Sequence, residues 1–575
     1  DILYMALAIA AACLIRSNCY IVLAAMACVL VVKAIGDKKI RHVLALFCCI
    51  AVYFVGHMGL IKVYENRLGV DLRHPMPSIL WVAMATQEGE DGKEAGWYNG
   101  LAWDLFVDEA GRDQEVATEM AKAVIAESME RFKGDPAYML DFYKRKIVSQ
   151  WSEPTYACQV ETNHRWSERS AFMDRLYKGD LWKPFVRVMD VCQSLIYWGA
   201  LLFLLLMIRK KIPVEKLGLI IVAIGGFIFY IFWEAKSRYV FPYFMMMLPC
   251  ACCGWELFVQ KLSQWWKKGR TQERVKGLTS HLEGFGGKAI LLLAGVPSAF
   301  LFLYSLVFTT VYESNDLEVP LQKMDPAPLI LLFVAAGLAV LYFAGKQLLK
   351  KEENRKRNLN LLLLAVLIHC AVFCTAWNLL AKSALRADPL YIHAIAGGFA
   401  TGDVGESAMD YLYTYPHQAG QALLLELVYR IFGYENFLAF RTLNTLGVLL
   451  LVFCGYRITG LLYENDRAKV NYLLLAAGCI PVLIYTNVIY GEVLAIAAVS
   501  LALWMFLTWL QEKKLWQFVC MTLALVCAVC LYGMANARTL RVTEYAVTLE
   551  GAGEDMTVAL LADLHLGYST DPAYI

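Results

Sequence analysis

Long apolar runs, separated by short polar and charged segments, dominate the sequence. At about 1.5 Å per residue, most of these runs are long enough to cross a hydrocarbon core of roughly 30 Å as an α-helix. The pattern predicts an all-α polytopic membrane protein with about thirteen transmembrane helices. The expected spans are 2–15, 19–33, 43–60, 188–207, 217–234, 242–260, 288–311, 329–345, 359–380, 442–461, 471–486, 493–510 and 516–533.

Basic segments between the apolar runs predict how the chain is oriented. Cytoplasmic loops are enriched in Lys and Arg, so these segments are expected in the cytoplasm, and this agrees with every expected span. The basic segments are Lys33–Arg41, Arg209–Lys211, Lys267–Arg274, Lys346–Arg357 and Lys513–Lys514. The segments then expected outside are 61–187, 235–241, 312–328, 381–441 and 487–492.

The outer segment 61–187 is too long to be a simple connector. Within it, Arg112 to Phe132 carries apolar residues at helical spacing, which predicts a helix packed over the membrane helices. Those apolar positions are Val116, Met120, Val124, Ile125 and Met129. The segment is therefore expected to form an α-rich extracytoplasmic domain.

Composition and charge narrow the function classes. Hydrophobic residues make up 59% of the chain and the net charge is only +2, so nothing indicates nucleic acid as a partner. Most of the 17 cysteines lie inside apolar runs, where they are typical of small buried hydrophobes rather than of a disulfide or zinc framework. The sequence has no phosphate-loop or dinucleotide-binding motif, so no nucleotide cofactor is expected.

The polar segment 381–441 carries the densest set of candidate functional side chains. Asp388 follows closely after the span that ends at Leu380 and precedes a proline, which favours an extended, restrained backbone. Asp403 and Glu406 lie in a Gly-rich turn that would hold them loosely, and Asp410 lies further from the span. Other candidates in the segment are Arg386, Tyr415, Pro416, His417, Gln418 and Arg441. Composition alone fits a functional site and a solvated connector equally well.

Two further candidates lie at the outer ends of expected spans. Lys236 and Arg238, with Tyr239 next to them, stand where a lipid phosphate would lie, and arginine binds phosphate through paired hydrogen bonds. The same cations are also typical of side chains that extend from a helix end to the membrane surface. Glu492 borders an apolar run, where a carboxylate is costly, which indicates a partner or a function.

These motifs together resemble bacterial GT-C glycosyltransferases, most closely the protein O-mannosyltransferase-like branch. Residues 288–515 are similar to the N-terminal catalytic half, with an acidic residue soon after a helix, a Tyr-Pro-His turn and a Tyr-x-Glu sequence. Residues 1–260 resemble the C-terminal half through Gly96–Gly100 and Ser237–Tyr243. The charged, Gly-rich segment 261–287 is expected to be a cytoplasmic linker between the two modules.

The two modules stand in the reverse of the order that the resemblance implies. This order is typical of a fusion, or of a misjoined product of neighbouring paralogous genes. The chain also begins at Asp1, inside an apolar run and without Met, which predicts a fragment rather than a signal peptide. Two partial copies need not form one complete active site.

The resemblance implies a hexosyltransferase of a bacterial-type cell membrane, with its site facing outside. Its donor would be a polyprenyl-phosphate-linked sugar and its acceptor an extracytoplasmic glycan or protein. Asp388 matches the acidic residue that acts as base on the acceptor or helps to hold a divalent metal ion. His417 would orient the acceptor or bind phosphate, although a lone histidine is more often structural. The other catalytic and substrate-binding residues expected are Glu492, Arg238, Tyr239, Lys236, Arg386, Arg441 and Tyr415.

The C-terminal part, 516–575, carries a second resemblance. After its expected span, two short strands are predicted at 541–549 and 556–561. The second strand leads into Asp563 and His565, which fall on the same side of a strand. This resembles the opening of calcineurin-like metallophosphoesterases, in which both side chains would be metal ligands. The later blocks of that family are missing from the sequence, so no phosphoesterase activity is expected.

Three classes of function therefore remain. The first is a lipid-linked glycosyltransferase, the second is a non-catalytic membrane protein or transporter, and the third is a membrane-anchored phosphoesterase fragment. A transporter favours ionisable groups or broken helices near the middle of the membrane. The charges here gather at the outer ends of the spans, which favours the enzyme.

Overall fold

The computed structural model describes residues 2–72, 74–90, 93–207, 213–267, 281–312, 320–324 and 327–511. Most of these residues are helical and very few lie in strands, which confirms an all-α polytopic membrane fold. Leu3–Glu512 forms one compact unit, so the two expected modules are parts of a single body. The expected span 516–533 and the two strands predicted after it lie outside the described residues.

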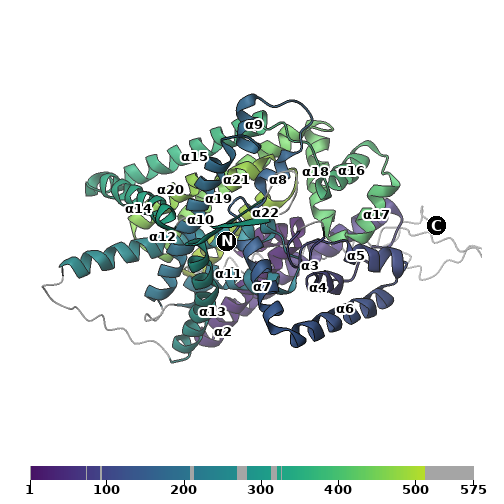
Figure 1. Ribbon diagram of the computed structural model, residues 1–575, viewed down its shortest axis with the longest axis horizontal. Coiled ribbons are helices and arrows are strands. Elements are labelled where there is room, and N and C mark those ends of the chain that lie inside the picture. The colour runs from purple at the N-terminus through teal and green to yellow at the C-terminus, as the bar shows by residue number, and fades with distance from the viewer. Residues whose placement is uncertain are drawn as a thin grey trace, which may run out of the picture. The chain divides into compact units, whose positions relative to one another are not determined.

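Ten helices in the described ranges are long and apolar enough to cross a membrane (Figure 1). They are η1 with α2 (Ser17–Asp37), α3 (Ile40–Leu68), α10 (Trp182–Met207), η3 with α11 (Val214–Phe232), α12 (Ser237–Lys267), α13 (His281–Ser305), α14 (Ala327–Leu348), α15 (Arg355–Leu380) preceded by η4 (Glu352–Asn354), α19 (Phe437–Leu462) and α22 (Glu492–Gln511).

Two of the expected spans differ from simple membrane-crossing helices. The first apolar run forms α1 (Ile2–Ile15), which is shorter than the ten spanning helices. The run at 471–486 is bent by 54° between α20 (Asp466–Gly478) and the segment Ile480–Asn487, which contains α21 (Ile480–Ile484) and η6 (Tyr485–Asn487). Pro481 explains the break, because proline lacks the backbone N–H that would continue the helix ladder.

A third difference concerns the expected span 288–311. Helix α13 ends at Ser305, and the chain continues as strand β1 (Phe308–Tyr312). This strand pairs in antiparallel register with β2 (Pro320–Met324), so that Phe308 faces Met324 and Tyr312 faces Pro320. β-branched residues Thr309, Thr310 and Val311 favour the strand over a last helical turn.

The segment 61–187 is α-rich, as predicted. The helix expected from Arg112 to Phe132 is α6 (Gln114–Gly134), and Asp113 caps it by accepting hydrogen bonds from the amides of Glu115 and Val116. The other elements of this segment are α4 (Ile79–Met84), α5 (Leu101–Trp103), the π-helix η2 (Asp104–Glu109), α7 (Pro136–Trp151), α8 (Cys158–Asn163) and α9 (Ala171–Tyr177).

The segment 381–441 is also helical and not an open loop. It forms α16 (Asp388–Thr401), α17 (Glu406–Thr414), η5 (Pro416–Gln418) and α18 (Ala419–Phe432). It contacts the segment 61–187 directly: Arg112 forms a 2.6 Å ion pair with Asp410, and Ser383 donates a 2.8 Å hydrogen bond to the carbonyl of Thr162. The two segments therefore lie at the same end of the helical bundle.

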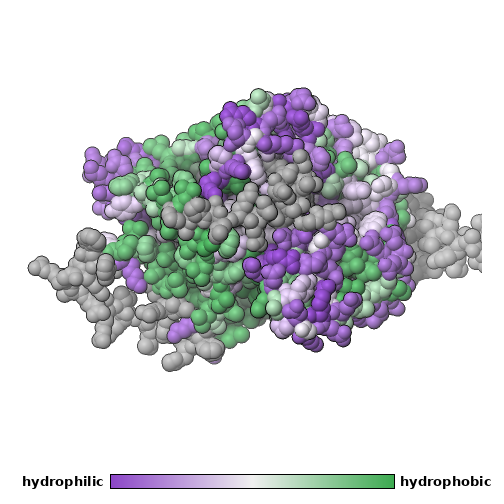
Figure 2. Space-filling model, viewed as in Figure 1, coloured by the Kyte–Doolittle hydropathy of each residue, from purple (hydrophilic) through white to green (hydrophobic). Residues whose placement is uncertain are grey.

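The arrangement separates a polar end from the apolar helices. In Figure 1, α4–α6 and α16–α18 gather on the right of the view, whereas α12, α14 and α15 extend to the left. Figure 2 shows hydrophobic surface over the helices on the left and mostly hydrophilic surface over α6 and its neighbours. A membrane fits the hydrophobic region, and the polar helices then cover one of its surfaces.

Helix α12, which follows Lys236 and carries Arg238 in its first turn, packs closely against α10. Gly199 of α10 and Gly254 of α12 allow the two backbones to touch, because a Cβ atom at Gly254 would lie 1.9 Å from the Gly199 carbonyl oxygen. Small residues at such crossings are typical of membrane helix pairs. A larger side chain at Gly254 would push the two helices apart.

Candidate functional site

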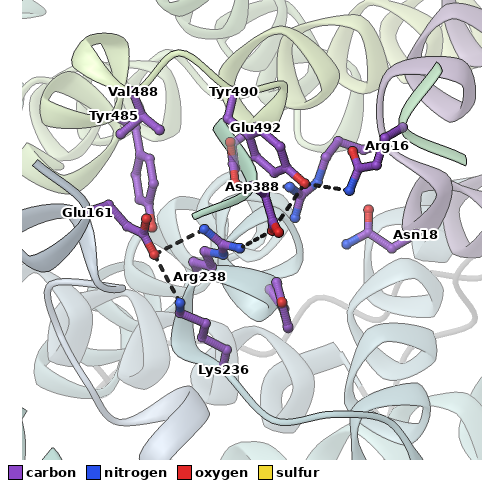
Figure 3. A network of polar contacts seen from close by, with 12 residues as sticks. Arg16, Asn18, Glu161, Lys236, Arg238, Asp388, Tyr485, Val488, Tyr490 and Glu492 are labelled. Atoms are coloured by element: carbon purple, nitrogen blue, oxygen red, sulfur yellow. Dashed lines mark hydrogen bonds and ion pairs between the residues drawn. The ribbon is translucent and has the colours of Figure 1, made fainter. Parts of the chain in front are cut away.

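Charged side chains from distant parts of the sequence meet at the polar end of the bundle (Figure 3). We call Arg16, Glu161, Lys236, Arg238, Asp388 and Glu492 the ion-pair cluster. Arg238 stands in the first turn of α12, and Asp388 is the first residue of α16. Glu492 begins α22, and Glu161 lies in α8. Arg16 occupies the break between α1 and η1.

Arg238 is the central cation of the cluster. Its Nη1 donates to Glu161 at 3.0 Å and its Nη2 donates to Asp388 at 3.2 Å. Lys236 adds a 3.1 Å ion pair to Glu161. The Arg238 and Glu161 side chains are 5% and 3% exposed, whereas the Asp388 side chain is 35% exposed. Asp388 is therefore held by a buried network but remains open to a substrate.

Two tyrosines complete the surroundings of Asp388. Tyr411 donates to its Oδ1 at 3.1 Å, and the hydroxyl of Tyr490 lies 3.5 Å from its Oδ2. Gln418 in turn donates to the Tyr490 hydroxyl at 2.6 Å. Asp388 does not have the extended backbone that was expected before Pro389. Instead it opens helix α16, where the amides of a helix start favour a carboxylate.

Arg16 and Glu492 form the second buried pair of the cluster. Their side chains meet at 3.0 Å and are 10% and 2% exposed. The Arg16 guanidinium also lies 5.1 Å from the centre of the Tyr490 ring, in cation–π range. Glu492 therefore has the partner that its apolar surroundings predicted, and that partner holds Tyr490 beside Asp388.

Charge within the cluster is balanced: the cations Arg16, Lys236 and Arg238 face the carboxylates of Glu161, Asp388 and Glu492. Burial alone would raise the pKa of Glu161, but Arg238 and Lys236 outweigh it and hold that pKa well below its ordinary range. Neighbouring Glu234 behaves differently. Its burial raises the pKa of its carboxyl to about 7, against the opposing effect of Lys236 and Arg238.

Arg386 and Arg441 lie next to Glu161, a member of the cluster, and the charge of Arg386 acts on the Glu161 carboxylate. Both line a small cavity together with Glu161. Arg441 is buried, and it donates to two backbone carbonyls, those of Ser383 at 2.8 Å and Asn487 at 3.0 Å. These contacts tie the chain just before Asp388 to the segment just before Tyr490. They support a structural role for Arg441 better than the phosphate contact predicted from the sequence.

We expect Arg441→Ala to lower the stability of the protein. The change leaves two buried carbonyls without their charged donor, and each such hydrogen bond contributes about 1.5–3 kcal/mol. The unfolding temperature of the purified protein in detergent should fall by several degrees. Arg441→Lys should restore only part of the lost stability, because lysine lacks the planar guanidinium that donates to both carbonyls. An unchanged unfolding temperature combined with weaker donor binding would instead favour the phosphate role.

His417 and Tyr415 belong to an aromatic group next to Asp388. The His417 ring lies edge-on to Trp81 at 6.3 Å and to Tyr415 at 6.1 Å, and its side chain is exposed. Tyr415 packs against Tyr411 at 4.9 Å. Trp81 stacks on Trp233 at 5.7 Å, at the end of α11. Tyr239 is close to the cluster too, where it donates to Glu234 at 3.4 Å. Aromatic rings therefore extend from a membrane helix end to Asp388.

The described residues contain no group of three or more His, Cys, Asp or Glu side chains that could hold a metal ion. Asp388 and Glu492 each pair with an arginine instead of with another carboxylate. The divalent metal ion that the resemblance allows stays a prediction. Asp563 and His565, the other predicted ligands, lie outside the described residues.

The sequence patterns did not indicate Glu161, Arg16 or Tyr411, and Tyr490 entered them only as the tyrosine of the Tyr-x-Glu sequence. Glu161 stands in a long polar segment with no neighbouring motif, so nothing local marks it. Arg16 did leave a signal, because a charge in a short break between two apolar runs needs a partner. Lys236, Arg238, Asp388 and Glu492 were all nominated, and the structure brings them together (Figure 3).

Both expected modules contribute to the one cluster. Residues 1–260 supply Arg16, Glu161, Lys236 and Arg238, and residues 288–515 supply Asp388 and Glu492 together with the neighbouring Tyr411 and Tyr490. The fold and this cluster define a multi-pass membrane protein with a buried ion-pair network at one end of its helices. No family model, curated protein or solved structure matches the chain.

Proposed function

We propose that the protein is an integral membrane glycosyltransferase that moves a sugar from a polyprenyl-phosphate donor to an extracytoplasmic glycan or protein. The observation that carries this proposal is the contrast in exposure within the ion-pair cluster. Asp388 is 35% exposed, whereas Glu161 and Glu492 are 3% and 2% exposed. One open carboxylate among buried, oriented charges is what a general base requires.

In the proposed reaction, Asp388 accepts the proton of an acceptor hydroxyl. The acceptor oxygen forms a bond to the anomeric carbon, the bond from that carbon to the phosphate oxygen breaks, and its electron pair stays on the phosphate. Arg238 supports this step, since its buried Nε has no hydrogen-bond partner among the described residues and is a donor for the leaving phosphate. Lys236 adds positive charge beside it.

A transfer assay tests the function directly. Membranes that contain the protein are incubated with radiolabelled polyprenyl-phosphate mannose or glucose, and label is measured in the glycan and protein fractions. Label should appear only when the protein is present. Absence of protein-dependent transfer from every polyprenyl-phosphate hexose tried would contradict the proposal.

The proposal also requires the ion-pair cluster to face outside, as the basic segments predict. We expect Ser167→Cys and Ser407→Cys to react with an impermeant thiol reagent in intact cells, with the unsubstituted protein as background. Reaction of only one of the two would contradict their common side. If both react only after the cells are opened, the orientation is the opposite of the predicted one.

A transporter is the second candidate, and the bent pair formed by α20 and Ile480–Asn487 is the observation that favours it. The groups at the bend are soft and apolar, since the Cys479 thiol lies 3.6 Å from the sulfur of Met245. Charged groups lie at the helix ends instead. Uptake of labelled substrate into sealed vesicles without formation of a glycosidic bond would favour the transporter.

A further inference from the structure

A cavity of about 550 Å³ lies between α12, α14 and α20. Both α12 and α14 pack on α20, which forms the floor of this groove. Its walls are apolar and include Trp255, Phe258, Leu338 and Leu341. The volume is in the range of known ligand sites, which are about 300–1,000 Å³.

The groove lies at the other membrane surface from the ion-pair cluster. Glu256, which lines it, follows Arg238 by 18 residues in the same helix, a rise of roughly 27 Å. That rise is close to the roughly 30 Å thickness of a hydrocarbon core. Leu262 and Phe343 at the groove are 47% and 63% exposed. The groove therefore opens toward the lipid near one surface and is independent of the proposed transferase site.

Two opposite charges face this apolar groove. Glu256 is buried, and its Oε1 accepts hydrogen bonds from Gln260 at 3.0 Å and Asn465 at 3.3 Å. Within the described ranges, no group donates to its Oε2. The guanidinium of Arg467 lies 5.9 Å from the centre of the Tyr342 ring, and its positive charge acts on Glu256 across the groove. A ligand with one acidic and one basic group matches both.

We propose that this groove binds a phospholipid whose head group carries a phosphate and a primary ammonium, as in phosphatidylethanolamine. The Arg467 fork pairs with the phosphate, and the ammonium donates to Glu256 Oε2. One acyl chain lies along Trp255 and the leucines. A purely anionic head group would bring negative charge to Glu256, and a choline head group has no N–H to donate.

The test measures lipid binding by native mass spectrometry of delipidated, full-length protein in detergent. Dioleoyl phosphatidylethanolamine, phosphatidylcholine and phosphatidylglycerol are titrated in turn. We expect the first to bind about tenfold more tightly than the other two, since one charge-assisted hydrogen bond to a buried group is involved. Equal binding of all three lipids, or a preference for phosphatidylglycerol, would overturn the proposal.

Variants separate the two charges from the groove itself. Arg467→Gln should weaken phosphatidylethanolamine binding about tenfold, and Glu256→Gln should remove the preference over phosphatidylcholine. Leu338→Trp fills the groove without changing charge and should abolish binding, which keeps the test decisive if Glu256→Gln does not fold. Arg357→Gln, an exposed cation that does not line the groove, is the control. Wild-type binding by Leu338→Trp or by Arg467→Gln would show an adventitious lipid only.

Discussion

Asp388→Asn is expected to reduce sugar transfer by at least about 100-fold, because a general base contributes roughly 10²–10⁴-fold and an amide cannot take the proton. Arg238 and Tyr411 donate to different oxygens of Asp388. In the variant the amide oxygen can accept from Arg238 while the amide NH2 donates to the Tyr411 hydroxyl oxygen, so the local geometry should survive. Insertion into the membrane and the unfolding temperature should stay close to those of the wild type. The measurement is the initial rate of label transfer from a polyprenyl-phosphate sugar at saturating donor.

Asp403→Asn is the matched control for this change. Asp403 is exposed and follows Gly402, in the turn after α16, and it makes no ion pair among the described residues. The same substitution there should leave the rate within about twofold of the wild type, as surface changes usually do little. Near-normal transfer by Asp388→Asn, or loss of transfer by Asp403→Asn, would contradict the assignment of the base.

Arg238→Ala is expected to have the second largest effect, and to act on both folding and transfer. Removal of one partner of a buried ion pair costs about 3–5 kcal/mol, because the remaining charge is left uncompensated. Here the change removes the 3.0 Å arginine partner of Glu161 and the 3.2 Å arginine partner of Asp388. The unfolding temperature should fall clearly, and the apparent KM for the donor should rise in the protein that remains folded.

Arg238→Lys distinguishes charge from geometry at this position. Lysine keeps the positive charge but has no planar fork, so it cannot bond Glu161 and Asp388 in the same way. We expect partial recovery of stability and weaker recovery of transfer. Arg175→Ala is the control, since Arg175 forms a solvent-exposed pair with Asp180, and exposed ion pairs contribute little to stability. If Arg238→Ala keeps the stability and the KM of the wild type, the proposed role of Arg238 in donor binding is wrong, and its side chain only extends to the membrane surface.

Local sequence patterns predicted most of the helices of the fold. Apolar runs and basic segments are read along the chain, so the membrane helices and the common side of 61–187 and 381–441 were predictable. Helix α6 was predictable too, since its apolar residues recur at helical spacing. The bend at Pro481 and the strand after Ser305 were missed, because hydropathy does not distinguish a continuous helix from an interrupted one.

The candidate site was predictable only in part, because local patterns mark single charged residues and do not identify their partners. Asp388, Lys236, Arg238 and Glu492 drew attention because a charge beside an apolar run needs an explanation. Their partners did not stand out, since Glu161 lies in a polar segment where a carboxylate is ordinary. Arg441 was predicted from its charge to bind substrate, and the contacts that the structure gives its side chain are with the Ser383 and Asn487 carbonyls.

By itself, the sequence determined that the protein is an all-α membrane protein, and it determined which polar segments share one end. Hydropathy and charge act residue by residue, so these properties need no knowledge of distant contacts. Only the tertiary structure decided that side chains from residues 1–260 and from residues 288–515 meet in one ion-pair cluster. Arg238 meets Asp388 across 150 positions, and Arg16 meets Glu492 across 476. Such pairings depend on how the helices pack, because a buried charge takes whichever partner the fold brings within reach.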